Sequence, residues 1–360
     1  MNVNLRGRPA AGLLILFFLF FLAAVPGVQA QSLDPETFNL PDEPSIIILA
    51  DPRDGSEIRN LAPAWAVAEG QAKTATIIVE YVDPQSWDPQ AIAAFEYAKS
   101  IWETLIVSPV PIRVRAEWTD MNYLGRGVLG GAWLEDLRAN FTGAGQPNTW
   151  YVSSLANHLA KRDLDERNHD INAQFNSGFS NWYFGTDGAK AGKYDLVSVV
   201  LHELGHGLGF YDSFNVSSGI GSWGAGTFYP IIYDRFVANG AGQLLLENYQ
   251  NHSAALGYQL QSNNIFFVGP AAVAANRGAY VPLYAPYVWS SGSSIAHLGQ
   301  AFEGTPNALM TYSLAAGEVQ HYPGPVALGV LKDLGWGTGV AQSNLSEHLY
   351  LPLLRAGQQN

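Results

Sequence analysis

Along the first half of the chain, some segments have the residue pattern of a strand and others have apolar residues at the spacing of a helix. Residues 75–82 (ATIIVEYV) and 112–118 (IRVRAEW) are rich in β-branched residues and predict strands. Between them, apolar residues recur at helical spacing over 89–104, and Asp88 stands at the N-cap position. Residues 171–175 (INAQF) predict a further strand. This order predicts a twisted sheet covered by helices, and therefore an α+β fold.

A second helical pattern covers residues 195–209. Its apolar positions form one stripe at helical spacing: Val197, Val200, Leu201, Leu204 and Leu208. Asp195 can cap the start, and Gly209 can end the helix because the residue just past the last turn often needs a positive φ. We therefore expect a helix whose stripe belongs to the core.

The second half of the chain is less regular. Residues 213–290 are rich in Gly, Ser, Asn and aromatic residues and predict a loop-rich region, whereas residues 326–334 predict a late helix. Two earlier segments are ambiguous. The Gly-rich residues 125–132 suggest a loop with a short strand, and residues 153–166 suggest a short helix or an irregular surface segment.

The N-terminus has the pattern of an export signal. Arg6 and Arg8 precede an apolar run over 13–25, and small residues follow it up to Ala30. A membrane anchor is the alternative, but about 13 apolar residues are fewer than the roughly 20 that cross a bilayer as a helix. We therefore predict a signal peptide over 1–30, cleaved near Ala30, and a secreted protein with no membrane span after cleavage.

Residues 31–72 contain several prolines and one short apolar run at 46–49. This composition fits a propeptide, a linker or an N-terminal extension that wraps the domain, and the pattern does not choose among them. The rest of the chain is expected to form a domain and a tail: 73–337, made of an N-lobe (about 73–210) and a C-lobe (about 211–337), and then 338–360.

Composition narrows the classes of function. Hydrophobic residues make up 48% of the chain and charged residues 14%, which suits a folded domain and not a disordered one. The formal net charge of −12 argues against a nucleic-acid partner. The chain has no Cys, so disulfides, thiol nucleophiles and thiolate metal ligands are all excluded.

The segment His202-Glu203-Leu204-Gly205-His206 carries the candidate chemistry. Residues four apart lie on one face of a helix, so both imidazoles can bind one ion. Zinc suits imidazole ligands and lowers the pKa of a water molecule to near 7. Glu203 can then act as general base towards this metal-activated water and pass the proton to a leaving amine. A coincidental pattern on a buried helix is the alternative.

Two imidazoles do not complete a hydrolytic zinc site, and the sequence offers two candidates for the third protein ligand. Asp212 follows soon after the helix, and a carboxylate oxygen is an acceptable zinc ligand. His297 lies far downstream, shortly before Met310. Taken alone, His297 would be read as an ordinary surface or core histidine, and Asp212 as an ordinary loop residue.

The run His202–Asp212 (HELGHGLGFYD) resembles the extended signature of the metzincin metallopeptidases, in which Gly209 would turn the chain. Most of these families have His at the position of Asp212, whereas the snapalysin type has Asp. The layout as a whole resembles the leishmanolysin group, whose third His follows a long insertion in a segment shortly before a Leu-Met-Thr-like turn. His297 and the Leu309-Met310-Thr311 turn fit that pattern.

The resemblance implies a two-lobed zinc endopeptidase fold with a loop-rich C-terminal lobe and one catalytic zinc ion. It implies that His297 is the third ligand and that Met310 is the Met-turn residue, an apolar base beneath the metal. In some metzincins a Tyr two residues beyond that Met reaches the metal or the oxyanion, a role that would fall to Tyr312, which is otherwise a packed aromatic residue. Substrates would be proteins or peptides, and we expect a monomer.

Other assignments stay open. The alternative function is a secreted non-catalytic binding protein or adhesin with a structural metal site. Asp and Asn residues in the loops could bind calcium, but no calcium-loop pattern supports this. The remaining histidines stand alone in polar sequence and are expected to be solvated: His158, His169, His252, His321 and His348.

Overall fold

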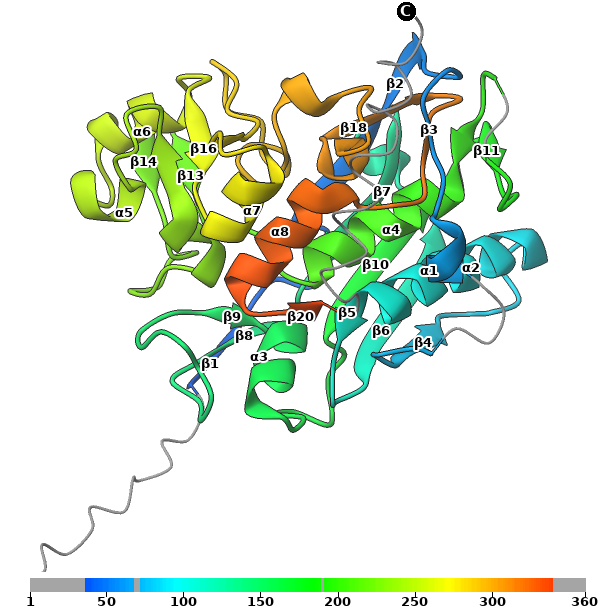
Figure 1. Cartoon of the computed structure of the whole chain (residues 1–360), viewed down its shortest axis with the longest axis horizontal. Coiled ribbons are helices and arrows are strands. Elements are labelled where there is room, and N and C mark those ends of the chain that lie inside the picture. The colour runs from blue at the N-terminus through cyan, green and yellow to red at the C-terminus, as the bar shows by residue number, and fades with distance from the viewer. Residues whose placement is uncertain (1–35, 68–71, 189–190, 339–360) are drawn as a thin grey trace, which may run out of the picture. The chain divides into compact units, whose positions relative to one another are not determined.

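A six-stranded mixed sheet forms the centre of the fold (Figure 1). The computed structural model describes residues 36–67, 72–188 and 191–338. The strands run in the order β18 (Ser313–Ala316), β2 (Ile46–Asp54), β7 (Val128–Trp133), β10 (Ile171–Asn176), β6 (Ile112–Thr119) and β4 (Ile77–Tyr81). β7 is antiparallel to both of its neighbours, and the other neighbouring strands are parallel. The sheet thus joins segments from both halves of the chain.

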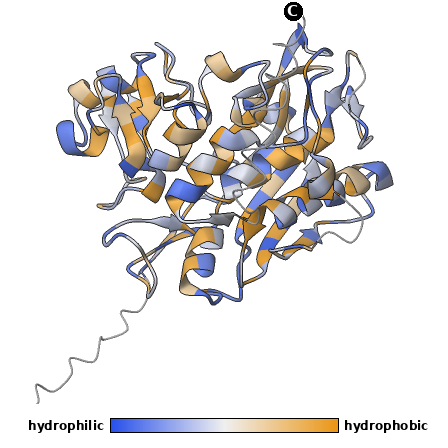
Figure 2. Ribbon diagram, viewed as in Figure 1, coloured by the Kyte–Doolittle hydropathy of each residue, from blue (hydrophilic) through white to orange (hydrophobic). Residues whose placement is uncertain are grey.

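Helix α2 (Pro89–Leu105) packs on this sheet. Asp88 caps its start by accepting a hydrogen bond from the backbone N–H of Gln90 at 2.8 Å. The Phe95 ring on its buried face meets Phe175 of β10 edge to face, with ring centroids 5.6 Å apart. Bands of apolar and polar residues alternate along the helix in Figure 2, as its predicted periodicity requires.

Helix α4 (Leu196–Gly207) is buried over its whole length and packs against α2 and β7. The carboxylate of Asp195 caps it by accepting from the N–H of Ser198 at 2.8 Å. The chain leaves the helix at Gly209, whose φ of 117° favours glycine. The indole N–H of Trp102 in α2 donates to the carbonyl of Leu201 at 3.0 Å, which fixes the two helices together.

The other elements are short. Those before α4 are β1 (Glu36–Asn39), β3 (Arg59–Asn60), α1 (Ala64–Val67), β5 (Ile106–Val107), η1 (Asn122–Leu124), β8 (Asp136–Ala139), β9 (Tyr151–Val152), α3 (Ser153–Ala160), β11 (Trp182–Tyr183) and β12 (Tyr194–Asp195). Those after it are β13 (Asn215–Ser217), β14 (Ile220–Ser222), η2 (Ile232–Phe236), β15 (Val237–Asn239), α5 (Leu245–Asn248), α6 (Ala254–Leu260), β16 (Ile265–Phe267), α7 (Pro270–Ala275), β17 (Val281–Pro282), η3 (Gln300–Phe302), η4 (Ala308–Met310), β19 (Val319–Gln320), α8 (Gly324–Leu334) and β20 (Gly337–Thr338).

The structure confirms the mixed α+β class and the main elements expected from sequence: β4, α2, β6, β10, α4 and α8. The two ambiguous segments contain strand β7 and helix α3. No helix in the described ranges is long and apolar enough to cross a membrane. The expected signal peptide at 1–30 and residues 339–360 of the tail lie outside the described residues.

Two expected domain boundaries do not match the sheet. The sequence predicts that residues 46–54 precede a domain that starts at 73, yet they form β2, a strand with sheet neighbours on both sides. The apolar run at 46–49 was too short to reveal this, because the strand continues into a polar stretch, Asp51-Pro52-Arg53-Asp54. The expected boundary between the lobes, near residue 210, does not match the sheet either, because β18 from the C-terminal half pairs with β2 in the N-terminal sheet.

Candidate metal centre

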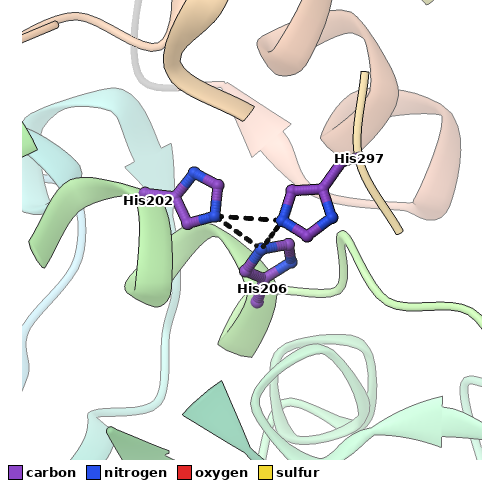
Figure 3. Close-up of side chains that lie close together, drawn as sticks. All are labelled: His202, His206 and His297. Atoms are coloured by element: carbon purple, nitrogen blue, oxygen red, sulfur yellow. Dashed lines mark hydrogen bonds between the residues drawn. The ribbon is translucent and has the colours of Figure 1, made fainter. Parts of the chain in front are cut away.

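Three imidazoles from two distant parts of the chain meet beside helix α4 (Figure 3). His202 and His206 project from consecutive turns of α4, and His297 faces them from the segment between β17 and η3. The Nε2 atoms of His202 and His206 lie 2.9 Å apart, and His297 Nε2 lies 3.2 Å from each of them. Within the described ranges, this is the one group of His, Asp and Glu side chains close enough to hold a metal ion.

In each of the three rings, the hydrogen bond made by Nδ1 determines that Nε2 is the atom that could bind an ion. Each Nδ1 lies by a backbone carbonyl oxygen: His202 by Leu309 at 2.6 Å, His206 by Phe210 at 2.7 Å and His297 by Ser293 at 2.8 Å. A carbonyl oxygen only accepts, so each Nδ1 carries the proton and each Nε2 offers a lone pair. Three lone pairs converging this closely repel one another unless a cation lies among them.

The spacing of these nitrogens fits zinc. Tetrahedral zinc with Zn–N bonds of about 2.0–2.1 Å places its nitrogen ligands about 3.3 Å apart. The separations of 2.9 and 3.2 Å are close to that value. The carbonyl partners also hold each ring in the tautomer and orientation that a zinc-binding histidine needs.

Burial keeps all three rings neutral. None of the three side chains is exposed to solvent. Loss of hydration lowers the pKa of His202 to about 4 and lowers the pKa of His206 and of His297 well below the usual range. The rings therefore stay unprotonated at neutral pH, the state in which imidazole binds a metal.

Glu203 follows His202 on α4 and is fully buried, with no described hydrogen-bond partner for either carboxylate oxygen. It lies beneath β7, because a Cβ added at Gly130 would come within 3.3 Å of Oε1 and 3.1 Å of Val199. Burial alone raises the pKa of Glu203 well above its usual range. A buried carboxyl group with no partner is costly, so its presence needs a reason.

Met310 ends η4 and lies against the turn of α4 that contains Gly205. A Cβ added at Gly205 would lie 2.7 Å from the Met310 sulfur, so an alanine there would force the methionine side chain to shift. The neighbouring residue, Leu309, supplies the carbonyl oxygen that orients His202. The turn at 308–310 therefore both fills the space below the helix and positions one imidazole.

The two other candidate site residues do not join the imidazoles. The carboxylate of Asp212 accepts a hydrogen bond from the N–H of Phe214 at 2.7 Å, and burial together with the charge of Asp234 raises its pKa. The ring of Tyr312 stacks on Tyr284 with centroids 4.1 Å apart, while its hydroxyl contacts the amide of Gln300 at 3.3 Å. The structure thus brings His297 to the helix histidines and does not bring Asp212.

The expectation that the remaining histidines are solvated is wrong for His321. Its side chain is fully buried, and Nε2 donates to the carboxylate of Asp195 at 2.7 Å. His158 is half-buried and stacks on Trp336, whereas His169 lies by Glu80 and His252 is exposed. His348 lies outside the described residues.

The sequence does not predict the backbone carbonyls that orient the imidazoles, because a side-chain pattern carries no signal for them. His321 left only a weak signal, a histidine that follows the candidate Met-turn. His297 was found because it precedes that turn.

A family model described as SPBPB7E8-like matches residues 163–251. The match is less than half of the chain; it contains α4 with His202 and His206 but ends before His297. No curated protein and no solved structure was found to match the chain.

Proposed function

We propose that the chain is a secreted zinc endopeptidase of metzincin type that acts as a monomer on proteins or peptides. The observation that carries this proposal is the meeting of three proton-free imidazole nitrogens, together with a fully buried carboxyl group on the same helix, Glu203, that has no described hydrogen-bond partner. The likeness of residues 202–212 and 293–312 to the metzincin pattern supports it. The secreted location rests on the pattern of residues 1–30, and N-terminal sequencing of exported protein tests it.

The roles of the side chains follow from their chemistry. His202, His206 and His297 would hold the zinc ion through Nε2, which leaves a coordination position for the reaction. Zinc, when bound, supplies a positive charge that lowers the pKa of water and polarises a peptide carbonyl. Glu203 takes the proton from the attacking water and gives it to the leaving amine. A cation beside Glu203 also favours its ionised form, which the dry surroundings alone disfavour.

A purely structural metal site fits less well. Structural zinc sites are closed by four protein ligands. The group in the described residues supplies three, all of them imidazoles. A structural site also has no use for a buried carboxyl group next to its ligands, and burying one unpaired lowers stability. The Glu203 side chain therefore favours a catalytic centre over an adhesin with a structural metal.

The test is zinc dependence. Purified protein should contain about one zinc ion per chain and should hydrolyse an unfolded protein such as casein. Removing the ion with a chelator should stop hydrolysis, and adding zinc back should restore it. A matched variant, His252→Asn at the exposed histidine, should behave as the unsubstituted chain. Hydrolysis that continues in the metal-free protein would contradict the proposal.

A further inference from the structure

The candidate centre is closed to solvent. His202, Glu203, His206 and His297 all have no exposed surface, and the two Glu203 oxygens have no described hydrogen-bond partner. A hydrolytic site must admit both water and a peptide. Some part of the fold therefore covers the centre in this structure and has to move before a substrate can bind.

Strand β2 lies where that cover would be. On one side it pairs antiparallel with β7, which lies over Glu203. On the other side, the N–H of Ile47 donates to the carbonyl of Gly292 at 3.1 Å, and the N–H of Leu49 donates to that of Tyr312 at 3.1 Å. Gly292 shortly precedes His297, and Tyr312 shortly follows Met310. The segment thus bridges both walls of the centre through its backbone.

The Ile48 side chain of β2 lies on the same face of the sheet as Glu203. Ile48 pairs directly with Gly130, and directly paired residues lie on one face. The face under Gly130 is the one that holds Val199 and Glu203. Ile48 is only 2% exposed, so its branched side chain is sealed on that face and helps to keep water from the carboxyl group.

Backbone pairing on both edges is also how an extended peptide adds to a protein. A bound peptide pairs with a free strand edge through its main chain, and alternate side chains enter pockets. Without β2, the edge of β7 and the carbonyls of Gly292 and Tyr312 would be free to accept such a peptide. Hollows continue past both ends of the segment, one lined by Ser45 and Gly292 and the other by Asp54 and Ser313.

We propose that residues 45–54 occupy the peptide groove of the enzyme in place of substrate and keep the chain largely latent, so that only a basal rate of hydrolysis remains. This proposal rests on the proposed peptidase function and adds to it a substrate class: extended peptides with a branched aliphatic residue at the position of Ile48. The chain has no Cys, so no thiolate can block the metal. Latency here comes from an apolar side chain that excludes water and from backbone pairing that excludes peptide.

A reversible disulfide that fixes β2 to β18 tests the proposal. Leu49 and Ser313 are direct partners in the parallel pairing of β2 and β18, and a disulfide between them, in the double variant Leu49→Cys with Ser313→Cys, would be the sole one in the chain. The rate at which a chelator removes zinc from the full chain measures access without relying on activity. We expect oxidation to slow zinc loss at least about tenfold and reduction to restore it. The single variant Leu49→Cys should not respond.

A second pair of variants should open the groove. Ile48→Asp places a charge on the buried face and should speed zinc loss and peptide hydrolysis about tenfold or more. Its matched control is Ile78→Asp, a 53% exposed position on β4 of the same sheet, which should leave both rates unchanged. A synthetic peptide of residues 45–54 should inhibit the opened variant, and the same peptide with Asp at the Ile48 position should not.

The two proposals fail in different ways. Equal rates of zinc loss from the oxidised and the reduced double-cysteine variant would overturn the covering role of β2, whatever the activity. Equal rates of zinc loss from Ile48→Asp and Ile78→Asp would do the same. Zinc loss that follows β2 as expected, with no peptide hydrolysis by any form, would support the cover and overturn the peptidase.

Discussion

Gly205 and Met310 are in direct contact, with the methionine sulfur 2.7 Å from the point where a Cβ at residue 205 would lie. Gly205 stands between Glu203 and His206 on α4, and Met310 ends the turn whose Leu309 carbonyl orients His202. This contact couples the packing of the turn to the position of the imidazoles.

Gly205→Ala should therefore strain the centre. Overfilling a packed interior costs about 1–3 kcal/mol, and the strain should reach His202 and weaken zinc retention. In a Met310→Ala background, the same substitution should cost much less because the sulfur is gone. Urea unfolding of the four forms measures both costs. Additive losses would mean that the two residues do not act on each other.

The buried pair of His321 and Asp195 should matter for stability. Both side chains are fully buried, and the Asp195 carboxylate also caps α4. His321→Asn removes the imidazole that donates to this buried carboxylate, which then keeps only its bonds from Ser198, so the free energy of unfolding should fall by about 1–3 kcal/mol. The same change at exposed His252 should alter it by less than about 0.5 kcal/mol. Equal effects in urea unfolding would contradict the structural role of the pair.

Asp170 should make stability depend on pH. Burial raises its pKa to about 7, although its oxygens accept from the N–H of Arg113 and the amide of Asn157. Between the unfolded pKa near 4 and about 7, the folded state binds the extra proton, so the contribution of Asp170 is full at low pH and is lost as pH rises through 7.

The contribution of Asp170 to the pH dependence can be measured by comparing the unsubstituted chain with Asp170→Asn. From about pH 5 to about pH 8, the unsubstituted chain should lose about 2–3 kcal/mol of unfolding free energy relative to Asp170→Asn, which has no proton to exchange there. Urea unfolding at both pH values gives the difference. Parallel curves for the two proteins would show that Asp170 does not titrate in this range.

The sequence indicated the parts of the fold that depend on local pattern. The period of 89–104 and the caps Asp88 and Asp195 predict α2 and α4 because helices are stabilised by neighbours in sequence. The HExxH spacing likewise places His202 and His206 together on one face of a helix. These features need no knowledge of distant segments.

Other features depend on packing between distant segments, and the sequence alone does not predict them. β2 has only five apolar residues before Asp51, and its strand form comes from pairing with β7 and β18. His321 stands in polar sequence, yet a short parallel pairing of β19 with β3 carries that part of the chain into the core. Neither arrangement leaves a period that a single sequence can show.

The third ligand can be tested by zinc content. The structure places His297 within 3.2 Å of both helix imidazoles, whereas Asp212 is engaged with the backbone of Phe214. His297→Ala should weaken zinc binding by about 100-fold or more, and the isosteric Asp212→Asn should retain one ion per chain. Loss of zinc from Asp212→Asn alone would reverse the assignment.

The most direct test of the proposed catalytic centre is the rate of casein hydrolysis by zinc-loaded Glu203→Gln, measured in the full chain and in the Ile48→Asp background. The amide keeps the shape of the side chain but cannot take a proton from water. Glu117→Gln, at a half-buried carboxylate on β6, is the matched control. We predict zinc content near one per chain in all forms, with hydrolysis reduced by at least about 100-fold only where Glu203 is changed. Unchanged hydrolysis by zinc-loaded Glu203→Gln would contradict the account.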